Sequence, residues 1–85
     1  GRPYWGHGVM TEAATELLRF GFETLELHRI EGRFILGNDR SLAVMKNCGM
    51  QYEGTARGGM LIKGLYRDIG TAAILRDEFE RQVKD

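Results

Sequence analysis

Residues 4–13 read Tyr-Trp-Gly-His-Gly-Val-Met-Thr-Glu-Ala, and the interpretation of the whole chain starts from this stretch. Gly6 and Gly8 lie one residue apart, directly before a helix-like pattern. Because glycine adopts backbone angles closed to other residues, a Gly-x-Gly turn can aim successive N–H groups into one concavity that suits an anion. The first turn of a following helix adds unpaired N–H groups and a partial positive charge. The stretch therefore predicts a phosphate site at a helix N-terminus. The alternative is a tight turn before a surface helix.

Two common phosphate loops do not fit this stretch. A P-loop requires Gly-Lys-Ser/Thr after its spacer, and no Lys occurs before Lys46. A dinucleotide-binding turn requires a preceding strand and a third small residue, and that third position holds Thr11. A different class of phosphate site is therefore needed to explain the glycine pair.

Hydrophobic periodicity predicts an α+β fold, with a mostly antiparallel sheet of three strands and two packed helices. The predicted helices cover residues 10–24 and 39–48, and the predicted strands cover residues 28–36, 50–62 and 65–75. The first helix carries an apolar stripe formed by Ala14, Leu17, Leu18, Gly21 and Phe22.

Glycine and polar residues mark the expected turns and ends of these helices and strands. Lys63-Gly64 predicts a two-residue hairpin turn, and Gly58-Gly59 predicts a bulge. Gly49 is expected to end the second helix, and Asn38 or Asp39 to cap its start. Residues 76–84 are expected to form a polar tail with one helical turn or two.

Several charged or reactive side chains are expected to have structural rather than catalytic roles. Glu31, beside two Arg residues, is expected on a solvated face, with an acceptor pocket as the alternative. Arg67 and Asp68 are expected to form a surface ion pair, with the border of an acceptor site as the alternative. Cys48 is expected to behave as a small core hydrophobe, and His28 as a structural histidine.

Composition narrows the function classes. The 85 residues suit one small domain, and 12 basic and 12 acidic residues are interspersed, which argues against a large nucleic-acid footprint. No apolar run is long enough to span a membrane. One cysteine and two scattered histidines predict neither a disulfide framework nor a metal site. The chain begins with Gly rather than Met, so we expect a piece of a longer protein.

The order and spacing of several short motifs resemble the GNAT superfamily of N-acetyltransferases, in its branch of ribosomal-protein N-terminal acetyltransferases. The resemblance runs through nearly the whole chain and covers the second half of the family's domain, so residues 1–85 are expected to form a partial acetyltransferase domain. The residues that carry it are Pro3-Tyr4-Trp5-Gly6-His7-Gly8, Thr11-Glu12-Ala13, Phe20-Gly21-Phe22-Glu23, Leu27-His28-Arg29-Ile30-Glu31, Asn38, Ser41, Gly49-Met50, Glu53-Gly54 and Tyr66-Arg67-Asp68.

The resemblance implies a set of site residues for acetyl-coenzyme A. The pyrophosphate would lie against the backbone of Trp5, Gly6, His7, Gly8, Val9, Met10 and Thr11. The family usually has Lys or Arg where this chain has His7, so the backbone would do most of the binding here. Asn38 would bond the pantetheine arm. Ser41 would lie near the cofactor sulfur, as the catalytic residue that protonates or stabilises the leaving thiolate.

The resemblance also implies a function, which is acetyl transfer to a primary amine, most simply a protein N-terminal amine. The alternatives are a small amine such as an antibiotic or a polyamine, and a non-catalytic coenzyme A-binding or interaction module. The family's general base and oxyanion donors lie largely on a strand upstream of Gly1, so this segment alone is expected to be inactive or nearly so. We expect a cytoplasmic protein with no nucleic-acid or membrane partner. Its open sheet edge would pair with the missing half of the fold or with a second copy.

Overall fold

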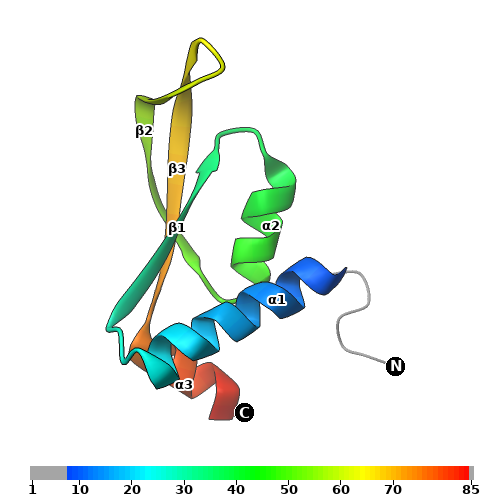
Figure 1. Cartoon of the computed structure of the whole chain (residues 1–85), viewed down its shortest axis with the longest axis vertical. Coiled ribbons are helices and arrows are strands. Elements are labelled where there is room, and N and C mark those ends of the chain that lie inside the picture. Colours follow the sequence, from blue (N-terminus) through cyan, green and yellow to red (C-terminus); the bar gives the residue numbers. More distant parts are fainter. Residues whose placement is uncertain (1–7, 85) are drawn as a thin grey trace.

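The computed structural model describes residues 8–84, so Trp5, Gly6 and His7 lie outside the described residues. The architecture is α+β, as the sequence predicts (Figure 1). Each strand boundary lies within one residue of its predicted position. In chain order the elements are α1 (Gly8–Arg19), the π-helical turn η1 (Phe20–Thr24), β1 (Arg29–Ile35), α2 (Asp39–Asn47), β2 (Gln51–Ile62), β3 (Leu65–Leu75) and α3 (Arg76–Lys84).

The three strands form one antiparallel sheet in the order β1-β3-β2. Lys63 and Gly64, with φ of 52° and 83°, make the two-residue turn between β2 and β3, and this confirms the predicted hairpin. The register shifts between Ala56 and Met60, which confirms the bulge predicted at Gly58-Gly59. β1 and β2 are the two outer strands of the described sheet.

The helices gather around one end and one side of the sheet, and the distal part of the β2–β3 hairpin projects away from them (Figure 1). α1 and η1 together cover the predicted helix over 10–24, with the last turn widened so that Leu25 N–H donates to Phe20 O at 3.1 Å. Gly21 lies against β1, where an added Cβ would be 2.5 Å from Ile30 Cδ1. This confirms that glycine at this position permits a close helix-to-sheet contact.

The core lies between α1–η1, β3 and α3, and its buried residues are Leu18, Phe22, Cys48, Ile74 and Phe79. The Phe22 and Phe79 ring centroids are 5.3 Å apart. The core position of Cys48, which is 2% exposed, confirms its expected role as a small hydrophobe.

The C-terminal segment corrects the predicted two-helix arrangement. Instead of a polar tail with one or two turns, residues 76–84 form a third helix of nine residues. Its one aromatic residue, Phe79, is fully buried, and Glu78 Oε1 accepts a hydrogen bond from Leu75 N–H at 2.9 Å at the helix start. The mostly polar composition of residues 76–84 did not indicate that Phe79 would pack in the core.

Two smaller expectations also need correction. Leu17, assigned to the apolar stripe of the first helix, is 71% exposed. Arg67 and Asp68 form no ion pair in the described chain, because neighbouring residues on a strand point to opposite faces. Asp68 instead accepts a hydrogen bond from Gly58 N–H at 2.8 Å and so supports the bulge.

Two further observations concern residues 8–84 as a whole. None of the helices formed by these residues has both the length and the apolar character needed to cross a membrane. Within the same residues, no three His, Cys, Asp or Glu side chains are grouped so that they could hold a metal ion.

Candidate functional site

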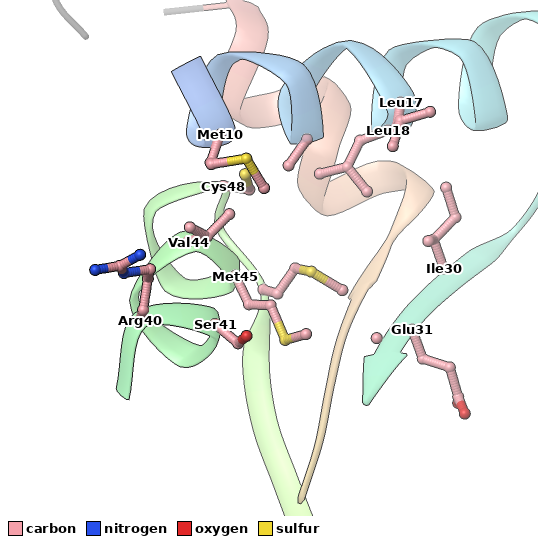
Figure 2. A pocket seen from close by; sticks show the side chains of 13 residues that line it. Met10, Leu17, Leu18, Ile30, Glu31, Arg40, Ser41, Val44, Met45 and Cys48 are labelled. Atoms are coloured by element: carbon pink, nitrogen blue, oxygen red, sulfur yellow. The ribbon is translucent and has the colours of Figure 1, made fainter. Parts of the chain in front are cut away.

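A groove of about 360 Å³ opens between α1, β1 and α2 (Figure 2). Its walls are apolar, and the three polar side chains among its lining residues are Glu31, Arg40 and Ser41. The lining residues are Met10, Ala14, Leu17, Leu18, Ile30, Glu31, Gly32, Arg40, Ser41, Val44, Met45, Cys48 and Met50.

One wall of the groove begins at the N-terminus of α1. The helix starts at Gly8, two residues earlier than predicted, and Gly8 takes a left-handed φ of 71°. Among residues 8–84, no atom from another part of the fold lies within 4 Å of the place that a Cβ on Gly8 would take. The first N–H groups of an α-helix have no acceptor within the helix, and at the start of α1 these include the N–H groups of Gly8, Val9 and Met10. This end of the helix therefore places N–H donors that have no acceptor within the helix beside the groove.

Thr11 has an unusual environment in this first turn. It is 5% exposed, and its Oγ1 is the one buried side-chain oxygen or nitrogen of the described chain without a hydrogen-bond partner. Its carbonyl oxygen accepts from Thr15 Oγ1 at 2.9 Å and lies 3.6 Å from Cys48 Sγ. A buried hydroxyl is normally paired, so Thr11 is an exception among the described residues, and it is not among those that line the groove.

The opposite wall is α2, and its first turn holds the other two predicted site residues. Asn38 is the N-cap, since its Oδ1 accepts from Ser41 N–H at 3.1 Å, and this confirms its structural role. Ser41 is half-buried and lines the groove. The structure thus brings Met10 and Ser41, 31 positions apart in sequence, to one groove, whereas Asn38 is not among its lining residues.

Glu31 lines the groove from β1 but belongs to a charged network on the strand surface. Arg29 holds Glu53 through two hydrogen bonds of 2.7 and 3.1 Å and donates to Glu31 Oε1 at 2.7 Å, and Arg33 lies 3.6 Å from Glu31. The hydrogen bonds from Arg29 lower the pKa of Glu53, and those same bonds raise the pKa of Arg29. The Glu31 carboxylate points away from Ser41 in Figure 2.

Sequence reasoning missed most of the groove's lining. Ser41, Val44, Met45 and Cys48 recur at three- and four-residue spacing on α2, and Leu17 belongs to the stripe assigned to the first helix. The same periodicity that predicts a core face therefore also marks the groove. A groove-lining residue differs from a core residue because α1 and α2 lie apart there, and the spacing of apolar residues in the sequence does not indicate how far apart two helices lie.

The sequence and the fold both match a known family of acyl-transferring domains. A model described as the acetyltransferase (GNAT) domain matches residues 1–51, and the chain belongs to the GNAT family. Among curated relatives, the protein named "Putative ribosomal N-acetyltransferase YdaF" of Bacillus subtilis is 35% identical over 91% of this chain and 45% of its own length. The [ribosomal protein uS5]-alanine N-acetyltransferase of Escherichia coli is 35% identical over 80% of this chain and 35% of its own.

Solved structures agree on the fold. Mutant forms of the spermidine/spermine N-acetyltransferase SpeG from Vibrio cholerae superpose with a TM-score of 0.83 at 25% identity, covering 91% of this chain and 46% of theirs. The chain thus spans less than half the length of the relatives it matches.

Proposed function

We propose that this chain forms the donor-binding part of an acetyl-coenzyme A-dependent N-acetyltransferase that acetylates a primary amine, specifically a protein N-terminal amine. The observation that carries the proposal is the convergence of the α1 N-terminus and Ser41 on one groove. Membership of the GNAT family supports acetyl transfer as the reaction, and the groove is the proposed binding site for the donor.

The residues present fit coenzyme A. Open space at Gly8 allows a phosphate to approach the backbone, and the free N–H groups of the first helical turn suit its negative charge. The apolar groove between Met10 and Ser41 suits an extended chain such as the pantetheine arm, which the Asn38 side-chain amide would help to hold. Trp5, Gly6 and His7 complete the proposed loop from outside the described residues.

Acetyl-coenzyme A would supply the activated acetyl group as a thioester. In this proposal Ser41 donates its hydroxyl proton toward the departing sulfur, because a charged thiolate is stabilised by a nearby hydrogen-bond donor. Glu31 is a poor choice for the base that deprotonates the amine, since Arg29 and Arg33 already hold its carboxylate. The base and the oxyanion donors are therefore proposed to lie outside residues 8–84.

The acceptor is proposed from the relatives. Ribosomal-protein acetyltransferases match at 35% identity, which favours an N-terminal amine. The structural likeness to a spermidine/spermine N-acetyltransferase supports a polyamine as the second candidate. Release of coenzyme A, measured over a panel of N-terminal peptides and polyamines, would separate the two. A protein that binds the donor but turns over neither class would be a non-catalytic coenzyme A-binding module.

We further propose that residues 1–85 are a partial domain that requires an upstream strand, and that a cytoplasmic location goes with this activity. β1 is an outer strand of the described sheet, and an unpaired strand edge offers its backbone groups to another strand. That strand would come from the missing half of the fold or from a second copy.

The test of donor binding is a Gly8→Glu substitution in the full-length protein, with calorimetric titration of coenzyme A. A carboxylate in the proposed phosphate cradle should abolish measurable binding by crowding and charge repulsion. Gly64→Glu is the matched control, because Gly64 also has a positive φ with open space around it but lies at the distal hairpin turn. Equal affinity in the wild type and the Gly8→Glu variant would refute the cofactor assignment.

A second substitution, Asn38→Asp, separates capping from ligand binding. Aspartate caps a helix as well as asparagine does, so the stability of α2 should be retained. The substitution removes the amide donors and adds a negative charge, so affinity for coenzyme A should fall several-fold if Asn38 also contacts the donor. Wild-type affinity would limit Asn38 to its structural role.

A further inference from the structure

The proposed phosphate loop, residues 5–11, contains neither lysine nor arginine. No Lys or Arg occurs between Arg2 and Arg19, while Glu12 and Glu16 lie in that interval. Backbone N–H groups and the helix dipole supply only partial charges. A donor with several phosphate charges would therefore gain from a guanidinium contributed by another element.

Arg40 is the cationic residue that lines the groove. It lies in the first turn of α2, is exposed, and lines the groove next to Ser41. In Figure 2 it extends from α2 at the end of the groove where Met10 and the start of α1 lie. Glu31 lies at the opposite end, so the groove has a cationic end and an anionic end.

The position of Arg40 is not explained by the stability of α2. A cation in the first turn of a helix is on the unfavourable side of the helix dipole. Within residues 8–84 Arg40 also takes part in none of the ion pairs, which join other Arg residues to Glu or Asp. Its guanidinium is thus available to a ligand.

We propose that Arg40 is a second anchoring residue for the donor and binds one of its phosphate groups across the groove from the first turn of α1. The inference rests on the proposed function and adds to it a specific cation that the loop does not supply. Arginine suits this role because its planar donors match phosphate oxygens in a paired geometry.

The test measures the dissociation constant of coenzyme A for wild type and Arg40→Gln by calorimetry on the full-length protein. The substitution should raise the constant about tenfold, and Arg40→Glu should raise it further. The difference between wild type and Arg40→Gln should shrink when ionic strength rises from about 0.02 M to about 0.5 M, because salt screens an exposed ion pair. Thermal unfolding should be nearly unchanged, since Arg40 is exposed.

Dephospho-coenzyme A identifies the phosphate group. If Arg40 binds the 3′-phosphate, the variant's loss disappears with this ligand, whereas a persisting loss assigns Arg40 to the pyrophosphate. Both results support the inference. The matched control is Arg57→Gln on β2, which removes one positive charge outside the groove and should leave affinity within twofold of wild type.

Two outcomes would overturn the inference. Wild-type affinity in Arg40→Gln would exclude Arg40 as an anchor while leaving the proposed function intact. An equal loss in Arg57→Gln would mean that net charge, not local contact, is responsible. Failure of the wild-type protein to bind coenzyme A would instead refute the proposed function itself.

Discussion

The helix-covered base of the molecule and the distal β2–β3 hairpin both consist of regular secondary structure but differ in packing. At the base, Phe22, Ile74 and Phe79 are at most 3% exposed. On the hairpin, Leu61, Leu65 and Tyr66 are 57–72% exposed. Strand pairing and a well-formed turn are sufficient to shape the hairpin, whereas the base is held by side-chain burial.

This difference bears on the candidate site. The groove lies beside the packed base, where α1 and α2 take their positions from the core residues Leu18 and Cys48. Catalytic and binding groups need a rigid support, and the base provides one. The distal hairpin, by contrast, contributes no residue to the lining of the groove.

The largest expected effect of any single change belongs to Phe79. Phe79→Ala should lower the free energy of unfolding by about 3–5 kcal/mol, because it removes a fully buried ring and leaves a cavity against Phe22. Leu65→Ala on the hairpin should change it by less than about 0.5 kcal/mol, since Leu65 is 62% exposed. Urea denaturation of both variants measures the difference, and similar losses at the two sites would show that side-chain burial stabilises the hairpin as much as the base.

An intermediate effect is expected at the boundary between the two regions, where Phe34 of β1 covers Gly70 of β3. An added Cβ at Gly70 would clash with the Phe34 ring, so Gly70→Ala should cost about 1–3 kcal/mol. A smaller partner should relieve the clash, so the double variant with Phe34→Leu should lose less than the two single changes together. Strict additivity in urea denaturation would show that the contact does not limit packing.

The same contrast explains which parts of the fold were predictable. Strand alternation and turn residues such as Lys63-Gly64 act locally, so the hairpin and its boundaries could be predicted from the sequence. Burial depends on contacts far apart in the chain. Phe79 stands alone in a charged segment, and no local pattern indicated that it would meet Phe22 in the core.

The candidate site divides in a similar way. A helix N-terminus after Gly-x-Gly and a cap at Asn38 follow from short-range rules, and the described part of each has the expected form. The groove and the place of Arg40 within it depend on how α1 and α2 lie relative to β1. The roles of the site residues toward a donor stay predictions that the binding experiments test.

The smallest expected effect is that of Glu53, whose link to Arg29 joins the outer strands β1 and β2 across β3. The pair is exposed, with 43% of the Glu53 side chain and 37% of the Arg29 side chain accessible to solvent, so Glu53→Gln should lower stability only slightly at pH 7. Arg29 lowers the pKa of Glu53, so the folded state binds its proton less readily than the unfolded state. The stabilisation is therefore present above the ordinary glutamate pKa of about 4.3 and is lost as pH falls through the lowered value.

Urea midpoints of wild type and Glu53→Gln should accordingly differ at pH 7, and the difference should shrink in acid as Glu53 takes up its proton. About 1 M salt should also narrow the difference at pH 7, since it screens exposed charges. A difference that grows in acid would have the wrong sign for a carboxylate with a lowered pKa. That result would mean that the hydrogen bonds of Glu53, and not its charge, stabilise the link between β2 and β1.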